Sequence, residues 1–457
     1  MEKQHSGRSS FSGKLGFVLS AAGASVGLGN IWRFPYLAAK YGGGIFLLIY
    51  ILLAVTFGYT MIMAETALGR MTRKSPVGAF AASGKGRWRA FGGWINAVIP
   101  ILIVPYYSVI GGWVIKYLMG YITGHGSELA QDGYFSSFIA NGASVEIVFL
   151  LFTLLTLGII FAGVRNGVER VSRMMMPVLV VLSVIIAAYS VTRPGALEGV
   201  KYFLVPNPAN FSWMTVVTAM GQMFYSLSIA MGILVTFGSY MKKDVSIEGS
   251  TKNVEIFDTL IAMMAGLMII PAVFSFSGGD PDTLQAGPAL MFITIPKVFE
   301  SMELGSLVGV LFFVLVLFAA VTSSIALTES AVSTFEDELG WSRKKAAAVI
   351  GIIMVLLGSL SALGYGPLSG VTVIGMQFLD FFDFLTNSVM MPIAAIATCL
   401  LVSRIVGVEK IEEEVTLEGK PFRRKRIFNF MIKYLCPIFA AIILISSVAN
   451  ALGVISM

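Results

Sequence analysis

Oxygen-bearing side chains suited to binding a small cation occur inside three apolar stretches of this 457-residue chain. Asn30 closes the glycine-rich run GASVGLGN, Asp258 lies within an apolar run, and Thr322 and Ser323 are adjacent in AAVTSS. Hard cations such as sodium take their ligands from amide, carboxylate and hydroxyl oxygens and from backbone carbonyls. These residues therefore predict a cation site if the fold brings the three stretches together.

The run GASVGLGNIWRFP, residues 23–35, is a poor membrane helix although it lies inside an apolar segment. Irregular backbone at membrane depth is tolerated only where it is buried in protein or lines a cavity. At such a break, one half-helix offers N–H groups to a carboxylate and the other offers carbonyl groups to a small cation. A second weak stretch, SLSIAMG at 226–232, predicts the matching half of the site. Helix packing through Gly23 and Gly27 is the alternative explanation of the glycines.

The composition is that of a membrane protein, with 56% hydrophobic residues, 13% charged residues and a mean hydropathy of +0.83. A soluble domain carries about twice that charged fraction. Apolar runs of about 20 residues predict membrane-spanning helices, and they lack the alternating polarity of barrel strands. The sequence therefore predicts an all-α polytopic membrane protein in a lipid bilayer. We expect about eleven spans, near residues 14–38, 43–70, 92–122, 144–163, 170–192, 210–240, 251–276, 303–335, 343–362, 374–404 and 427–454.

The net charge of +6 does not indicate a nucleic-acid partner, because most Lys and Arg residues fall in short loops between the spans. If the spans alternate in direction, the basic loops share one side, which the positive-inside rule assigns to the cytoplasm. We therefore expect a cytoplasmic N-terminal segment, 1–13, and a C-terminus on the outside. Five spans in 14–192 and five in 210–404 would form two inverted repeats, because an odd number reverses the orientation of each half. Span 427–454 lies outside both repeats.

An enzyme is not expected from this sequence. His5 lies in the N-terminal tail, His125 lies in a loop, and Cys399 and Cys436 lie in apolar helices. This distribution supplies neither a nucleophile with its base nor a cluster of metal ligands. A channel or sensor gated by an amino acid is the competing class, because broken helices would serve a receptor as well.

Structural explanations of four candidate residues also stay open. Asp258 lies near a helix start and could remain hydrated, although a buried carboxylate at membrane depth marks a functional site by default. The hydroxyls of Thr322 and Ser323 could bond back to their own helix. Glu65, in AETALGR, could brace a neighbouring helix.

At these residues the sequence resembles the neurotransmitter:sodium symporter family. GLGNIWRFP is similar to the first-helix signature of that family, and YGGGIFLLIY, GVERVSRMMMP, GQMFYSLSIAMG, TSSIALTES and FEDELGWSR follow in the expected order. The chain looks like the shorter bacterial amino-acid transporters of the family, with one span fewer than the bacterial leucine transporter. The resemblance implies discontinuous helices 1 and 6, and sodium-coupled symport by alternating access in a bacterial inner membrane.

Two sodium sites are implied by the resemblance. The first would use the Ser25 carbonyl with Asn30, Ser226 and Asp258. The second would use carbonyl groups of Gly23, Val26 and Ala319 with the hydroxyls of Thr322 and Ser323. The resemblance also implies a set of substrate-binding residues: Ala24, Ser25, Leu28, Gly29, Ile103, Tyr107, Tyr225, Ser226, Ser228, Met231, Ser324 and Leu327.

Two departures from relatives sharpen this expectation. Monoamine carriers of the family have an aspartate where this chain has Gly27, so the ligand here should bring its own carboxylate. We therefore expect a neutral L-amino acid with an apolar side chain. Asp258 stands where many members have asparagine, and its fixed charge should remove any chloride requirement.

Gates are likewise implied by the resemblance. Arg33 should pair on the outer side with Asp380 or Asp383, with Tyr225 closing over the substrate. Arg8 and Asp337 should form an inner latch. We expect a monomer or a weak dimer.

Overall fold

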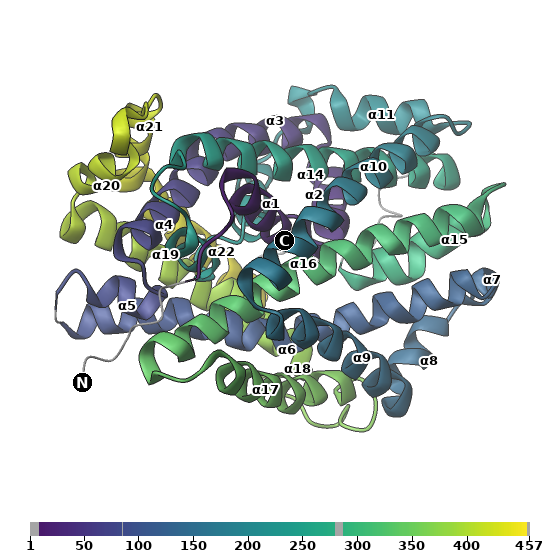
Figure 1. Cartoon of the computed structure of the whole chain (residues 1–457). Coiled ribbons are helices and arrows are strands. Elements are labelled where there is room, and N and C mark those ends of the chain that lie inside the picture. Colours follow the sequence, from purple (N-terminus) through teal and green to yellow (C-terminus); the bar gives the residue numbers. More distant parts are fainter. Residues whose placement is uncertain (1–8, 85, 279–286, 455–457) are drawn as a thin grey trace.

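The chain folds into a bundle of helices packed along one another, with connecting segments gathered at its ends (Figure 1). The computed structural model describes residues 9–84, 86–278 and 287–454. Pairing of the β type among these residues is limited to two isolated bridges, Gly43 with Pro206 and Val373 with Met376. The predicted all-α class is confirmed.

The long elements follow the predicted spans closely. They are α1 (Lys14–Ser25), η1 (Gly29–Arg33) and α2 (Phe34–Lys40); α3 (Gly44–Leu53), η2 (Ala54–Gly58) and α4 (Tyr59–Thr72); α6 (Arg87–Ile122); α9 (Gly142–Phe161); η3 (Val164–Glu169) and α10 (Arg170–Val191); α12 (Trp213–Ser226) and α13 (Ile233–Tyr240); α14 (Ile247–Ser277); α16 (Gly305–Leu339); α17 (Arg343–Leu363); α18 (Phe378–Asp383), η7 (Phe384–Met390), α19 (Met391–Leu400) and η8 (Leu401–Val406); and α21 (Lys425–Phe430), η10 (Met431–Leu435) and α22 (Cys436–Ala451).

Nine helices among the described residues are long and apolar enough to cross a membrane, and the bent pair of residues 14–25 and 29–40 gives a tenth crossing. The two parts of this pair meet at 55°. The helices α12 and α13 are too short to cross singly, since the 14 residues of α12 rise about 21 Å. Taken as one interrupted span, they bring the number of crossings to the expected eleven.

Short helices also lie in the connections between the predicted spans. They are α5 (Pro76–Ala81), α7 (Gly126–Leu129), α8 (Tyr134–Ala140), α11 (Ala196–Leu204), η4 (Pro208–Asn210), η6 (Leu290–Thr294), α15 (Ile295–Glu300), α20 (Val408–Val415) and η9 (Leu417–Gly419).

The two helix breaks lie beside each other. In the first, α1 ends at Ser25 and Val26 turns extended, with ψ of 94°. In the second, Ser228 and Ala230 adopt φ of 53° and 60°, values that oppose helix continuation in non-glycine residues. The Ser228 hydroxyl donates to the Ala24 carbonyl at 3.0 Å, so a side chain of one break satisfies the backbone of the other.

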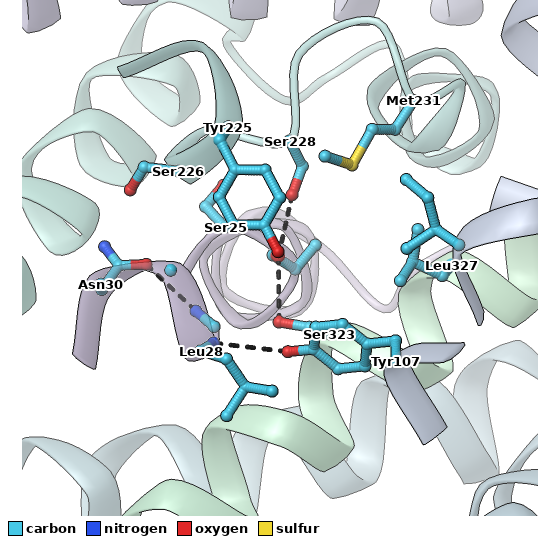
Figure 2. Close-up of a pocket in the computed structure, with 14 residues that line it drawn as sticks. Ser25, Leu28, Asn30, Tyr107, Tyr225, Ser226, Ser228, Met231, Ser323 and Leu327 are labelled. Carbon is cyan, nitrogen blue, oxygen red and sulfur yellow. Dashed lines mark hydrogen bonds between the residues drawn. The ribbon is translucent and has the colours of Figure 1, made fainter. Parts of the chain in front are cut away.

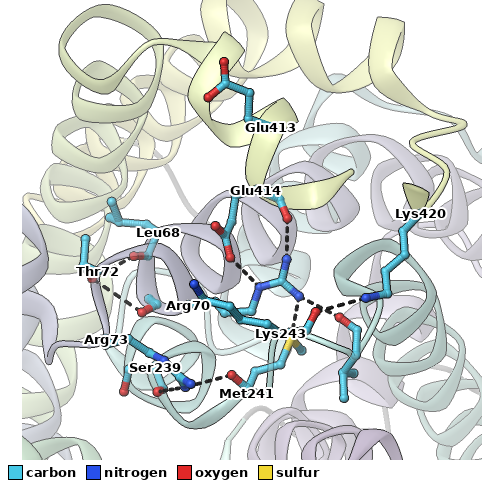
Figure 3. Close-up of polar contacts among 12 residues, drawn as sticks. Leu68, Arg70, Thr72, Arg73, Ser239, Met241, Lys243, Glu413, Glu414 and Lys420 are labelled. Atoms are coloured by element: carbon cyan, nitrogen blue, oxygen red, sulfur yellow. Dashed lines mark hydrogen bonds and ion pairs between the residues drawn. The ribbon is translucent and has the colours of Figure 1, made fainter. Parts of the chain in front are cut away.

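A buried arginine joins three segments at the end of the bundle that carries α20 (Figure 3). The Arg70 Nε donates to Glu414 Oε1 at 2.6 Å, and one terminal nitrogen donates to the Val245 carbonyl at 2.6 Å. The other terminal nitrogen donates to the Glu414 carbonyl. Because Arg70 is fully buried, these acceptors replace water around its charge.

Replacing Arg70 by alanine should lower the free energy of unfolding by about 3–5 kcal/mol, because the Glu414 carboxylate would lose its buried partner. A thermal melt of the purified protein in detergent measures this effect. Lys420→Ala is the matched control, since Lys420 bonds the Lys243 carbonyl and the exposed Glu418 carboxylate, and such surface contacts contribute little. Equal melting temperatures for the two variants would contradict the role of Arg70.

Candidate functional site

A cavity lies where the two helix breaks face α6 and α16 (Figure 2). It is lined by Ala24, Ser25, Gly27, Leu28, Gly29, Asn30, Ile103, Tyr107, Tyr225, Ser226, Ser228, Met231, Ser323 and Leu327. Every predicted substrate-binding residue except Ser324 is in this set. The cavity volume is about 30 Å³ in this conformation, room for about two water molecules. A larger molecule can therefore enter only if the walls of the cavity move apart.

Asp258 lies at one side of this cavity, within a cluster of neutral donors. The Asn30 amide donates to Asp258 Oδ1 at 2.8 Å. The Ser226 hydroxyl lies 2.9 and 3.1 Å from the two carboxylate oxygens. The predicted residues Asn30, Ser226 and Asp258 therefore meet, although they come from three separate spans.

The carboxylate of Asp258 is completely buried, which rules out the hydrated alternative considered from the sequence. No cationic side chain of the described residues neutralises it. A buried carboxylate without a counter-charge loses several kcal/mol of hydration. A small cation bound by these oxygens would supply the missing positive charge, so the residues fit a sodium site in both charge and ligand type.

The sequence did not predict Tyr50 as a member of this cluster, nor Gln222 as a contact of the first helix break. The Tyr50 hydroxyl donates to Asp258 Oδ2 at 3.0 Å and lies 3.2 Å from the Ser226 hydroxyl. The Gln222 amide donates to the Gly29 carbonyl at 3.0 Å. The available signal was that a tyrosine or glutamine inside an apolar span needs a polar partner.

A second cluster of oxygens surrounds Ser323 on α16. Its hydroxyl lies 3.3 Å from the Gly23 carbonyl, 3.2 Å from the Ala24 carbonyl and 3.4 Å from the Val26 carbonyl. Carbonyl groups at the end of α1 thus converge on the hydroxyl of a residue that lies 297 to 300 positions later in the chain. Converging carbonyls at a half-helix end are the arrangement that suits a small cation.

The neighbours of Ser323 point differently. The Thr322 hydroxyl donates to the Phe318 and Ala319 carbonyls of its own helix, at 2.9 and 3.2 Å, as the structural alternative anticipated. Its Cβ nevertheless faces Gly23, since a Cβ added there would lie 3.1 Å away. Ser324 lies 3.1 Å from the Thr156 hydroxyl of α9 and is absent from the cavity wall.

Glycines at the first break permit close packing around the cavity. A Cβ at Gly27 would lie 2.7 Å from the Ser323 hydroxyl and 3.1 Å from the Tyr107 hydroxyl. A Cβ at Gly29 would lie 2.5 Å from the Tyr225 ring. The Leu28 N–H donates to the Tyr107 hydroxyl at 3.4 Å. Close approach, rather than helix packing alone, explains these two glycines.

Glu65 of α4 supports the second break. Its Oε1 accepts the Ala230 N–H at 2.8 Å, in the stretch where Ser228, Ala230 and Gly232 all have positive φ. Its Oε2 is buried without a hydrogen-bond partner among the described residues. The geometry supports the bracing role that the sequence left open.

A vestibule of about 520 Å³ adjoins the cavity and shares Leu28, Tyr107 and Tyr225 with it. Arg33 lies over the Tyr225 ring, with its Cζ 5.2 Å from the ring centroid. Two predicted gate carboxylates also line the vestibule. Asp383 bonds Asn387 at 2.6 Å and interacts electrostatically with Arg33, whereas Asp380 bonds Tyr365 at 2.9 Å.

The start of the described chain packs at the end of α1 that lies away from the cavity. Phe11 is buried against Phe17, Phe237 and Tyr240. Asp337 accepts the Ser75 N–H at 2.6 Å, at the start of α5. The predicted partner of Asp337, Arg8, lies outside the described residues.

Two interrupted spans that border a cavity and bring clusters of oxygen atoms together beside it are typical of one class of protein, the secondary transporters with discontinuous helices. The family described as the sodium:neurotransmitter symporter family matches residues 8–130 and 134–454. The chain belongs to this family. It is a sodium-coupled membrane transporter and not an enzyme.

Relatives of the chain are similar over nearly their whole length. The sodium-dependent transporter YhdH of Bacillus subtilis is 34% identical over 453 residues, covering 97% of each protein. A sodium-dependent transporter of Haemophilus influenzae is 31% identical, covering 96% of this chain and 98% of its own. The crystal structure of MhsT in complex with L-phenylalanine matches with a TM-score of 0.86 at 35% identity, over 96% of this chain and all of that one.

Proposed function

We propose that this transporter imports a neutral, apolar L-amino acid together with sodium by alternating access. The observation that carries the sodium part is Asp258, a fully buried carboxylate whose hydrogen-bond donors in the described part of the chain are all neutral. The substrate part is supported by the cavity between the two helix breaks.

The two oxygen clusters support a proposal of two sodium sites. The first would use Asn30, Ser226, Asp258 and the Ser25 carbonyl. The second would use Ser323 and Thr322 with the carbonyls of Gly23, Val26 and Ala319. Bound sodium would neutralise Asp258 in the first site and satisfy converging carbonyls in the second.

An amino acid fits the lining of the cavity better than an amine does. The substrate carboxylate would meet the backbone near Ser25 and Gly29 and the Tyr107 hydroxyl, while its amino group would meet carbonyls near Tyr225. No carboxylate stands at Gly27 to pair with an amine, and packing against Ser323 leaves no room there for one. The remaining walls are apolar, formed by Leu28, Ile103, Met231 and Leu327 with Ala24. MhsT was crystallised with L-phenylalanine, which agrees with this substrate class.

The arrangement in the membrane follows from charge and the count of spans. We infer an N-terminus in the cytoplasm and a C-terminus outside, with 14–192 and 210–404 as inverted repeats. The vestibule then faces outward, and Arg33 closes it with Asp383, while Asp337 lies on the inner side. The bilayer of a bacterial plasma membrane surrounds a monomer or a weak dimer.

A thermal-shift screen of the twenty amino acids, with sodium or with potassium, tests the substrate class. Apolar L-amino acids should raise the melting temperature in sodium and much less in potassium, because ligand that binds only the folded state stabilises it. No stabilisation by any amino acid in sodium would contradict the proposal. Accumulation of the stabilising amino acid in proteoliposomes against its gradient separates a symporter from a channel, which cannot accumulate it.

Chloride should be unnecessary for transport, because the Asp258 carboxylate supplies a fixed negative charge beside the first sodium site. Uptake in proteoliposomes should proceed at an equal rate when gluconate replaces chloride completely on both sides. A matched assay with potassium in place of sodium should lose uptake. A large loss of uptake in sodium gluconate would show that an anion is needed.

A further inference from the structure

The start of α1 is held by a residue from another span. Gly13, at the helix start, provides no side-chain cap. Glu169, at the end of η3, accepts the Ser12 N–H at 2.9 Å and also accepts the Ser12 hydroxyl. Glu169 is only 2% exposed and lies 157 residues away from Ser12 in the chain. A carboxylate thus lies at the positive end of the α1 dipole, where negative charge is stabilising.

Gly16 gives the carboxylate its place over the first turn of α1. A Cβ at Gly16 would lie 2.2 Å from Glu169 Oε1 and 2.5 Å from its Cδ. Both atoms belong to the end of a flexible side chain, so a methyl group here would displace the carboxylate rather than the backbone. Any larger residue would therefore separate Glu169 from Ser12.

The same segment is also bound from the side of α13. The Lys242 Nζ donates to the Ser12 carbonyl at 3.0 Å, and the Phe11 N–H donates to the Tyr240 carbonyl at 3.1 Å. Residues 11 and 12 therefore bridge the base of α10 and the end of α13. This bridge lies at the start of α1, at the other end of the helix from the cavity residues Ala24 and Ser25.

We propose that Glu169 is a positioning residue that holds α1 in the closed conformation and thereby couples inner closure to the second sodium site. The α1 helix is 12 residues long, about 18 Å. Glu169 contacts the segment at the start of α1, and the carbonyl groups that lie near Ser323 belong to the last turn of α1. Release of one end allows this short helix to tilt, which disperses the carbonyls at the other end. Because sodium and closure favour each other by the same factor, a change that disfavours closure lowers the apparent sodium affinity, by at most that factor.

This inference rests on the proposed second sodium site, but the inner closure itself requires no knowledge of the substrate. A cysteine at Ser20 reports on it, because Ser20 lies on α1 and is 1% exposed. The two native cysteines, Cys399 and Cys436, are buried and give a low background of labelling. The readout is the rate at which a water-soluble maleimide labels Ser20→Cys, over a range of sodium concentrations and without any amino acid.

Glu169→Ala in the Ser20→Cys background should raise the labelling rate at saturating sodium about tenfold, a change of about 1.4 kcal/mol. It should also raise the sodium concentration that gives half-maximal protection at least threefold. Gly16→Ala should reproduce both effects. Arg173→Ala is the matched control, because the exposed Arg173 guanidinium lies 3.7 Å from the same carboxylate and contributes little. It should leave both values unchanged.

The inference is overturned if Glu169→Ala labels like the parent, if Arg173→Ala raises labelling equally, or if labelling rises without a change in the sodium dependence. The last result would mark a purely structural contact. Should Glu169→Ala not yield folded protein, Glu169→Gln decides: its amide removes the charge and keeps an acceptor for the Ser12 N–H. For Glu169→Gln, a smaller rise in labelling rate together with a higher sodium concentration for half-maximal protection supports the coupling. No change in either value overturns it. The labelling assay contains no amino acid, so it can be interpreted even if no amino acid stabilises the protein in the thermal-shift screen. The two proposals can therefore be contradicted independently.

Discussion

Asp258→Ala is expected to weaken sodium-dependent substrate binding strongly while the protein remains folded. The carboxylate is fully buried and receives hydrogen bonds from Asn30, Ser226 and Tyr50. Removing it takes away the negative charge that draws sodium into the first site. Removing a buried charge that lacks a counter-charge also removes its desolvation cost, which offsets the cavity left behind.

The measurement is the sodium concentration for half-maximal binding of the best amino acid from the screen. We expect at least a 100-fold increase for Asp258→Ala, about 2.7 kcal/mol. The sodium concentration for Asp258→Asn should fall between those of the parent protein and Asp258→Ala, because the asparagine amide keeps polar contacts but lacks the charge. Asp132→Asn is a suitable control, since Asp132 is exposed and pairs with Lys297 in a connecting segment. An unchanged sodium requirement in Asp258→Ala would place the first sodium site elsewhere.

Glu65→Ala is expected to weaken amino-acid binding at least tenfold. Its carboxylate accepts the Ala230 N–H at 2.8 Å inside the second helix break. Without that acceptor, a buried N–H group loses its partner, at a cost of about 1–3 kcal/mol. The strained backbone at Ser228 and Ala230 would then relax, and the cavity wall that includes Ser228 would change shape.

Glu65→Gln is the matched variant, because a glutamine can still accept the Ala230 N–H through its amide oxygen. It should retain binding within about threefold, whereas the alanine variant should not. Equilibrium binding of a radiolabelled amino acid in saturating sodium compares the two, with melting temperature as the test of folding. Equal losses in both variants would mean that the charge, rather than the hydrogen bond, is what matters at this position.

Glu169 shows why some functional contacts could not be predicted. It occurs in GVERVSRMMMP, a segment that indicates the family but gives no partner for the glutamate. Its contact with Ser12 joins residues 157 positions apart, and Gly16 makes room for it. Only the packing of α1 against η3 and α10 creates this relationship. Tyr50 is a similar case, because its hydroxyl meets Asp258 across 208 residues of chain, between α3 and α14.

Individual hydroxyl groups were harder to assign than the segments that carry them. The sequence placed Ser324 in the substrate cavity, but its hydroxyl lies beside Thr156 and Ser323 lines the cavity instead. Neighbouring residues on a helix point about 100° apart, so a rotation of a fraction of a turn exchanges them. Likewise, Arg33 had two candidate partners in the sequence, where loop lengths favoured Asp383 only slightly, and the structure adds an electrostatic interaction of Asp383 with Arg33.

The sequence by itself determined the all-helical membrane class, the spans and the positions of the two helix breaks. These properties depend on local composition, since apolar length sets the spans and glycine or serine runs weaken a helix wherever it packs. The tertiary structure alone decided which oxygens converge, whether Asp258 is hydrated or buried, and what Glu65 and Glu169 contact. Those properties arise between segments hundreds of residues apart, where burial and distance are set by packing.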